Sequence, residues 1–135
     1  MLERLIIAAL LIALGAAAWL LYNRFALRRL AVRAERDPLL ADLPSGTPVI
    51  LYFTTPTCAP CRTQQKPALT HLRTELGDSV QIVEIDATLQ PNDADRWGVF
   101  SAPTTFVIDR DGRPRHVNRG VASAETLRAQ IDAVA

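Results

Sequence analysis

The longest hydrophobic stretch of the chain covers residues 5–22, LIIAALLIALGAAAWLLY, and contains no charged residue. In a helix these residues rise by about 27 Å, which is close to the thickness of the hydrocarbon core of a bilayer. Trp19 and Tyr22 lie near the end of the stretch, where amphipathic rings suit the headgroup layer. We therefore predict one N-terminal transmembrane helix over residues 5–22.

Two other interpretations of this stretch are open. A cleavable secretory signal would use Ala16-Ala17-Ala18 as its cleavage site, but the segment before the apolar run is barely positive and the mature protein would begin with Trp19. A buried core helix would have to be enclosed on every face, and a domain of this size is too small for that.

The remaining pattern alternates between strands and helices. Strands are predicted over residues 49–53, 80–86 and 104–109 and through Val117, and helices over residues 59–76 and 91–97 and after the N-cap Ser123. Asp111-Gly112 between the last two strands is a hairpin signal. This order predicts a three-layer α/β sandwich, in which a parallel strand pair and an antiparallel hairpin form one mixed sheet with helices on both faces.

Between the anchor and this body, residues 37–47 have the composition of a linker, because Pro44, Ser45 and Gly46 break any regular element. The predicted organisation is therefore an anchor and basic stem over residues 1–36, a linker over 37–47 and one domain over 48–135.

Charge adds an orientation to the anchor. Residues 1–36 carry six Arg and two Glu, whereas residues 37–135 carry nine Lys or Arg and twelve Asp or Glu. Only Arg4 precedes the apolar stretch, and the other five arginines follow it, at positions 24, 28, 29, 33 and 36. The positive-inside rule then predicts a single-pass protein of the cell membrane with a cytoplasmic C-terminal domain, an extracytoplasmic domain being the alternative. The basic residues form no stripe along the body, so we expect no nucleic-acid partner.

Both cysteines of the chain lie in one motif, Cys58-Ala59-Pro60-Cys61, where a predicted strand passes into a helix. A thiol in the first turn of a helix faces unpaired N–H groups and the positive end of the helix dipole, which favour the thiolate. We predict that Cys58 is the nucleophile and that Cys61, one turn deeper, is the resolving thiol.

Other uses of this motif are weaker. Zinc needs four ligands, and only His71 and His116 remain outside the motif, neither in a second ligand cluster. A purely structural disulfide would close too short a loop to stabilise the fold much. We expect neither a metal ion nor a bound organic cofactor.

Over about residues 48–135 the sequence resembles the thioredoxin superfamily. The resemblance rests on YFTTPTCAPC at residues 52–61, VEID at 83–86 and WGVFSAPTTFVID at 97–109, with Pro67 and the Asp-Gly hairpin. It implies a thioredoxin-like fold and a cis-proline at Pro103 that lies against the sulfurs. Substrate would then pair with the backbone near Ala102, in a groove lined by Thr57, Ala59, Pro60, Trp97 and Val99. A position of Trp97 in the core is the equal alternative.

Three departures from the family pattern change what is expected of the site. Thr57 replaces the usual Trp before the first cysteine, and Tyr52 replaces the usual buried acid, so the proton acceptor for Cys61 is open. Glu84 and Asp86 are candidates for that role, or are simply solvated residues at a strand end. Pro67 lies one residue farther from Cys61 than is usual, which predicts a bulge in the helix.

The function predicted from these features is a membrane-tethered thiol–disulfide oxidoreductase. Its partners would be protein disulfide or dithiol substrates and an unidentified redox partner, and the compartment would set the direction of electron transfer. The alternative is a non-catalytic docking or assembly subunit of a membrane complex that uses the same fold.

Overall fold

The computed structural model describes residues 1–34 and 37–135, and the side chains of residues 1–29 and 37–135. Helices α1 (Leu2–Ala34) and α2 (Pro38–Ala41) precede the first strand, β1 (Val49–Thr54). The π-helix η1 (Cys61–Gln65), α3 (Lys66–Leu76) and the 3₁₀ turn η2 (Gly77–Ser79) lead to β2 (Gln81–Asp86). Then come α4 (Pro91–Arg96), β3 (Thr104–Ile108), β4 (Pro114–Arg119) and α5 (Ala124–Val134).

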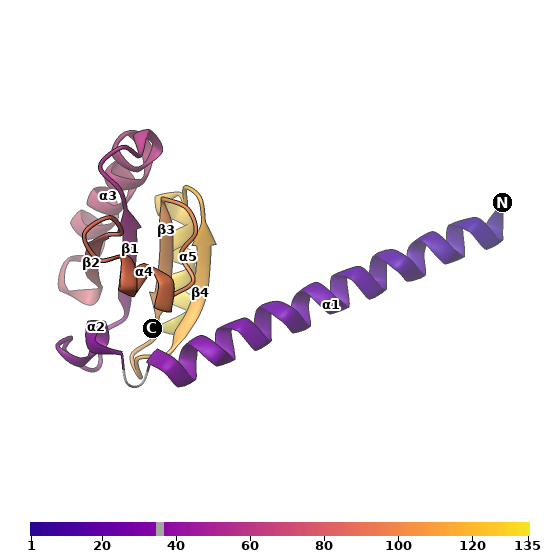
Figure 1. Ribbon diagram of the computed structural model, residues 1–135, viewed down its shortest axis with the longest axis horizontal. Helices are drawn as coiled ribbons and strands as arrows, with labels where there is room; N and C mark the ends of the chain where they lie inside the picture. Colours follow the sequence, from indigo (N-terminus) through magenta and orange to yellow (C-terminus); the bar gives the residue numbers. More distant parts are fainter. Residues whose placement is uncertain (35–36) are drawn as a thin grey trace.

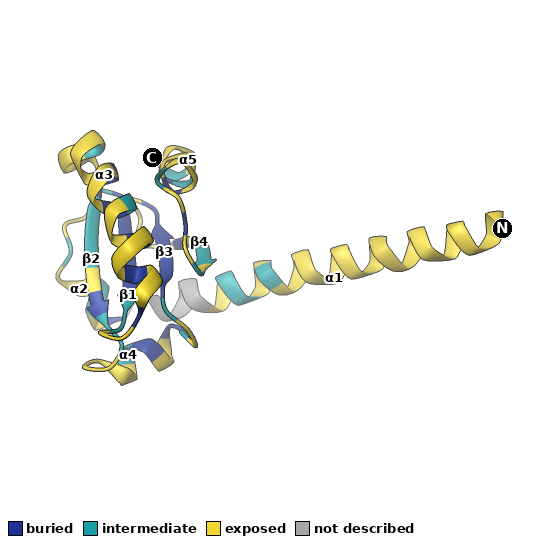
Figure 2. Cartoon of the chain, turned by 90° about the horizontal axis from the view of Figure 1, so that it is seen from above, coloured by how far each residue is buried: buried dark blue, intermediate teal, exposed yellow. Residues whose placement is uncertain are grey.

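Helix α1 projects away from the rest of the molecule (Figure 1). Residues Leu2–Arg29 are long and apolar enough to cross a membrane, and none of the most apolar part is buried. Figure 2 shows α1 exposed along most of its length, and its C-terminal part lies against β4. The helix continues beyond the predicted span to Ala34, whereas residues 35–36, the last of the predicted basic stem, lie outside the described residues.

The four strands form one mixed sheet in the order β2-β1-β3-β4. β1 is parallel to β2 and antiparallel to β3, which is in turn antiparallel to β4. Phe53 at the end of β1 pairs with Thr104 at the start of β3, and Val49 pairs with Ile108 at the other end. The C-terminal end of β1 and the start of β3 therefore lie at one end of the strands, and the β3–β4 turn lies at the other end.

Two hydrophobic cores lie on the two faces of this sheet. On one face, Ile50 and Tyr52 of β1 pack with side chains of α3 and α5. On the other face, Leu51 and Phe53 pack with Ala94 of α4 and with residues near α2. Alternate residues of β1 thus point to opposite cores, as the pleat of a strand requires. The predicted three-layer α/β sandwich with a mixed sheet is confirmed.

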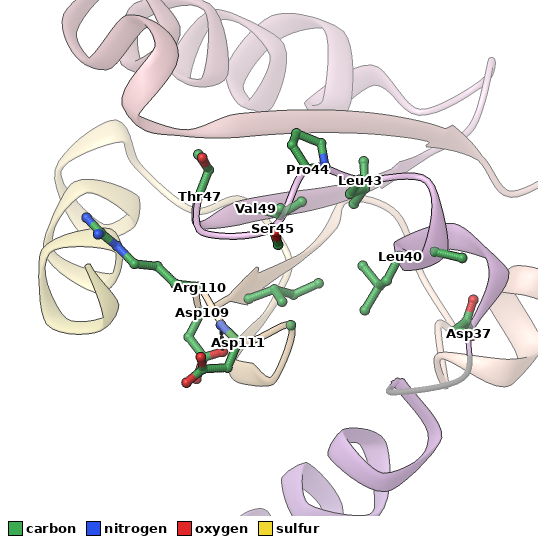
Figure 3. A pocket seen from close by; sticks show the side chains of 13 residues that line it. Asp37, Leu40, Leu43, Pro44, Ser45, Thr47, Val49, Asp109, Arg110 and Asp111 are labelled. Atoms are coloured by element: carbon green, nitrogen blue, oxygen red, sulfur yellow. Dashed lines mark hydrogen bonds between the residues drawn. The ribbon is translucent and has the colours of Figure 1, made fainter.

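A linker without regular structure was predicted over residues 37–47, but part of this segment is helical. Asp37 caps α2, because its Oδ1 accepts the Leu39 N–H at 3.0 Å, and proline occupies the first turn. The pair Asp-Pro therefore starts a helix here. Leu39, Leu40 and Leu43 pack against the second core. Figure 3 shows the hollow of about 390 Å³ that remains between this segment and the β3–β4 turn.

The helical stretch after Cys58 contains the predicted bulge. It begins with a helical turn at Ala59, widens to the π-helix η1 and continues as α3, with Pro67 in the first turn of α3. A π turn accommodates an extra residue without ending the helix. The proline is therefore absorbed into one helical stretch that runs from the motif to Leu76.

Candidate redox-active site

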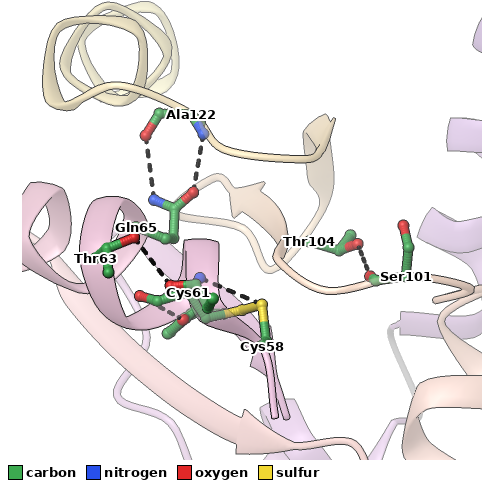
Figure 4. Close-up of a disulfide and its surroundings, with 9 residues drawn as sticks. Cys58, Cys61, Thr63, Gln65, Ser101, Thr104 and Ala122 are labelled. Carbon is green, nitrogen blue, oxygen red and sulfur yellow. Dashed lines mark hydrogen bonds between the residues drawn. A yellow bond between two sulfur atoms is a disulfide. The ribbon is translucent and has the colours of Figure 1, made fainter.

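The two cysteines lie just beyond the end of β1 and form a disulfide. The Cys58 N–H donates to the Thr55 carbonyl at 3.2 Å, which closes a turn between the strand and the helix. Cys61 begins η1, and the two Cα atoms are 5.3 Å apart. The protein is therefore described in its oxidised form (Figure 4).

The two sulfur positions are not equivalent. Cys58 is 9% exposed and Cys61 is 1% exposed. The Cys61 N–H donates to Cys58 Sγ at 3.2 Å. A hydrogen bond from a helix N–H stabilises negative charge on sulfur, so after reduction this geometry favours a thiolate at Cys58.

Tyr52 lies beneath the disulfide, at the position where the resemblance leads one to expect an acid. Its side chain is 1% exposed, and its hydroxyl donates to the Cys61 carbonyl at 3.4 Å. Burial raises the pKa of Tyr52 above its ordinary value of 10.0; the negative charge of Glu84 adds to the rise, which a hydrogen bond with Thr54 partly offsets. The phenol stays protonated near neutral pH, so it acts as a donor.

Gln65 is a buried residue of the site that the sequence analysis missed. Its amide exchanges two hydrogen bonds with the backbone of Ala122, at 3.1 Å from Nε2 to the carbonyl and at 2.8 Å from the Ala122 N–H to Oε1 (Figure 4). The sequence held a signal for it, because Gln65 follows Cys61 by four residues and precedes Leu69 by four, on the inward face of the helix.

The two candidate carboxylates at the end of β2 interact with other residues. Glu84 lies 3.7 Å from Lys66 Nζ. Asp86 Oδ1 accepts hydrogen bonds from the hydroxyl and the N–H of Thr88, at 2.5 and 2.8 Å. The hydrogen bond from the Thr88 hydroxyl has the largest effect and, with that from the Thr88 N–H, lowers the pKa of Asp86. Burial acts in the opposite direction but is outweighed. Both carboxylates thus interact with residues other than the two cysteines.

The loop before β3 carries the cis peptide bond that the resemblance implies, between Ala102 and Pro103. The Gly120 N–H donates to the Pro103 carbonyl at 2.9 Å, and the Thr104 hydroxyl donates to the Ser101 carbonyl at 2.7 Å. Ala102 packs against the core cluster that contains both cysteines. The loop is therefore held by these two hydrogen bonds, and Ala102 lies against the core that contains the disulfide.

The residues predicted to line a substrate groove fall into two groups. Thr57, Ala59 and Pro60 are exposed around Cys58, and Val99 is half-buried. Trp97 is 2% exposed and packs edge-on against Phe106 with ring centroids 5.1 Å apart. Trp97 therefore occupies the core position that the sequence analysis gave as the alternative.

Phe100 is an exposed aromatic residue that the sequence analysis passed over. Its side chain is 90% exposed, and it lines a shallow hollow of about 220 Å³ with Val99 and Ala102. The signal was an aromatic residue within the loop that leads to the cis-proline. With Val99 and Ala102 beside it, this ring gives the loop of the cis-proline an exposed apolar surface suited to a protein partner.

Among the side chains of residues 1–29 and 37–135, no three His, Cys, Asp or Glu are placed to share one ion. His71 Nε2 instead lies 3.2 Å from Glu75 Oε1 on the exposed face of α3.

Comparisons with known proteins agree with this geometry. The model of the thioredoxin family matches residues 35–133. Thioredoxin of Bacillus subtilis (strain 168) is 32% identical over 101 residues, which cover 75% of this chain and 94% of that protein. Chloroplastic thioredoxin Y of rice (Oryza sativa subsp. japonica) is 34% identical over 88 residues, 65% of this chain but 51% of that protein. The chain therefore spans about half the length of the rice relative.

Solved structures support the fold. A structure of thioredoxin-2, described as a component of malaria parasite protein secretion machinery, has a TM-score of 0.61 and 22% identity and covers 64% of this chain and 82% of that chain. With the family match and a disulfide placed between β1 and the following helix, the chain belongs to the thioredoxin family and is a protein-disulfide oxidoreductase.

Proposed function

We propose that this protein is a thioredoxin tethered to the cell membrane by α1, with its redox domain on the cytoplasmic side, where it reduces protein disulfides. The tether is supported by the apolar and unburied segment Leu2–Arg29. The side is supported by the arginines, of which one precedes the apolar stretch and five follow it. The direction follows from the side, because the cytosol is reducing.

In the proposed reaction the reduced protein acts through Cys58 first. The Cys58 thiolate attacks one sulfur of a substrate disulfide; a Cys58–substrate S–S bond forms, the substrate S–S bond breaks, and the departing substrate thiolate takes up a proton. Cys61 then loses its proton and attacks Cys58 Sγ, which releases the second substrate thiolate and forms the Cys58–Cys61 disulfide. Two electrons pass to the substrate, and a separate cytosolic dithiol donor restores the pair.

The substrate would lie over the exposed residues that surround Cys58. We assign contacts to Thr57, Ala59, Pro60 and Val99 and to the backbone of Ala102 beside Pro103. Among the described residues no hydrogen bond uses the N–H or the carbonyl of Ala102, so both groups are available to pair with an extended peptide. Phe100 would add an apolar contact at the edge of this surface.

The observation that carries the assignment of roles is the asymmetry of the pair. Cys58 Sγ accepts the Cys61 N–H and belongs to the more exposed residue, whereas Cys61 is enclosed by the core. A nucleophile needs access and a stabilised thiolate, and a resolving thiol needs only to reach its partner.

The test uses the full-length protein in detergent micelles. Reduction of insulin disulfides should be lost in Cys58→Ser, and Cys61→Ser should accumulate a mixed disulfide with its substrate. In single-cysteine variants the pH midpoint of alkylation should lie well below about 8.5 for Cys58 and near or above it for Cys61. Wild-type activity no higher than that of Cys58→Ser would contradict the proposal and favour a docking subunit.

The side of the membrane is tested separately in intact cells. A membrane-impermeant maleimide should modify Cys58 only after the cells are permeabilised. Modification of Cys58 in intact cells would contradict the cytoplasmic assignment and leave the redox chemistry untouched.

A further inference from the structure

A basic hollow of about 440 Å³ lies where α1 meets the start of β4. It is lined by Arg24, Leu27 and Arg28 of α1 and by Arg113, Pro114 and Arg115 from the hairpin. Pro114 is buried and Leu27 is half-buried, so these two supply apolar contact between the elements. The arginines come from two segments that are far apart in the sequence, and only the fold brings them together.

Most of the positive charge in this hollow is not neutralised by the side chains that the structure describes. Asp109 Oδ2 accepts from Arg115 Nε at 2.7 Å, and this is the one ion pair that the hollow's arginines make with the side chains of residues 1–29 and 37–135. Arg24, Arg28 and Arg113 therefore face the same hollow without a carboxylate from those residues. Guanidinium groups gathered in this way repel one another, and a bound anion would relieve that repulsion.

The hollow lies at a defined depth relative to the proposed membrane span. Along a helix, Arg24 lies about 3 Å and Arg28 about 9 Å beyond Tyr22, the last residue of the predicted span. The headgroup layer on each side of a bilayer is about 5–7 Å thick. These two arginines therefore bracket the level at which lipid phosphates lie, and the fold brings Arg113 to the same place.

We propose that this hollow binds the phosphate of an anionic phospholipid headgroup, held jointly by α1 and the β3–β4 hairpin. The proposal rests on the membrane anchor proposed above but not on the redox activity. Guanidinium groups suit this ligand because their N–H groups bond phosphate oxygens in pairs. Anionic lipids attract basic segments that lie next to the membrane on the cytoplasmic side.

A lipid bound here would orient the redox domain. The β3–β4 turn lies at the opposite end of the strands from the disulfide, because Ile108 pairs with Val49 and Thr104 pairs with Phe53. The four residue steps from Thr104 to Ile108 separate these two ends by about 13 Å. A headgroup that joins Arg113 to α1 would therefore fix the end of the domain opposite Cys58 against α1.

The experiment uses the full chain in lipid nanodiscs. Association of spin-labelled phosphatidylglycerol is compared with that of spin-labelled phosphatidylcholine for the wild type, for Arg113→Gln and for the matched control Arg119→Gln. Arg119 is the last residue of β4, at the opposite end of that strand from Arg113, and is also exposed. The wild type should bind phosphatidylglycerol in preference to phosphatidylcholine. In Arg113→Gln the ratio of the two affinities should fall about fivefold, and in Arg119→Gln it should stay unchanged.

Each other outcome has a definite meaning. A chain that does not remain in the discs contradicts the anchor, and the proposal with it. A chain that is anchored but shows no lipid selectivity, or in which Arg113→Gln and Arg119→Gln behave alike, overturns this site and leaves the anchor standing. Protection of the Arg113 and Arg115 amides from hydrogen exchange by inorganic phosphate in discs of phosphatidylcholine alone, without lipid selectivity, would overturn the lipid assignment in favour of a free anion.

Discussion

Gln65 and Ala122 are joined by two hydrogen bonds, so that the helix carrying Cys61 is tied directly to the chain that leads into α5. Gln65 is 0% exposed and Ala122 is 5% exposed. The amide satisfies both backbone groups of Ala122 in a region that water does not reach. A buried polar group of this kind stabilises a fold only while both partners are present.

Gln65→Met keeps most of the side-chain volume but leaves the Ala122 N–H and carbonyl without partners. We expect it to lower the free energy of unfolding of the oxidised protein by about 2–4 kcal/mol. Guanidinium unfolding of the chain in micelles, followed by tryptophan fluorescence with Trp19 replaced by Phe so that Trp97 alone reports, measures the change. Gln64→Met on the exposed side of the same helix is the control and should lie within about 0.5 kcal/mol of wild type. Equal stabilities of the two variants would contradict this role of Gln65.

Tyr52→Phe removes the hydroxyl that donates to the Cys61 carbonyl. The bond is long, so we expect a loss of only about 0.5–1.5 kcal/mol of stability. Because burial keeps the phenol protonated, the pH profile of disulfide exchange should keep its midpoints in the neutral range. Stopped-flow reduction of a substrate disulfide at a series of pH values measures this. Disappearance of a titration step in Tyr52→Phe would show that the phenol is the proton acceptor.

The sequence predicted the elements that are long or strongly patterned and missed those that depend on contacts between distant residues. The mixed sheet followed from apolar runs and from the Asp-Gly turn, which are local signals. Helix α2 is four residues long, too short to show a periodicity, and its cap also depends on Arg96, which lies 3.2 Å from Asp37.

The site was predicted unevenly for the same reason. The roles proposed for Cys58 and Cys61 follow from neighbours in the sequence, and the expectation of a helical bulge follows from the spacing of Pro67 compared with the family pattern. The position of Trp97 was not decided, because local sequence does not say whether a residue after a short helix turns toward the core or toward the surface. The pairing of Gln65 with Ala122 and the meeting of Arg28 with Arg113 depend on the tertiary fold alone.

Phe100→Ser tests whether the exposed ring contributes to substrate binding. If a protein substrate covers this ring, its loss should raise the KM for that substrate about tenfold and leave turnover of a small aromatic disulfide unchanged. Leu89→Ser is the control, because Leu89 is also a large apolar side chain in water, 79% exposed, outside the loop of the cis-proline. A similar rise in KM in both variants would point to a general loss of surface hydrophobicity instead.

Asp109 gives the fold a defined acid sensitivity. Burial is the largest single influence on the pKa of Asp109 and would raise it, but hydrogen bonds from the Arg115 side chain and from the N–H groups of Arg113 and Asp111, with the charge of Arg115, together lower it below its ordinary value of 3.8. A carboxylate whose pKa is lower in the folded state contributes stability that is fully present above about pH 3.8 and is lost as the pH falls through the folded-state pKa.

Asp109→Asn should therefore be less stable than wild type by about 1–2 kcal/mol at pH 7, and the difference should shrink as the pH falls below 3.8. Urea unfolding of the oxidised full chain at several pH values measures both effects. Asp111→Asn, an exposed neighbour in the same turn, should show neither. A difference between Asp109→Asn and wild type that stays constant down to the lowest pH would mean that packing, and not the charge of this carboxylate, stabilises the hairpin against which α1 lies.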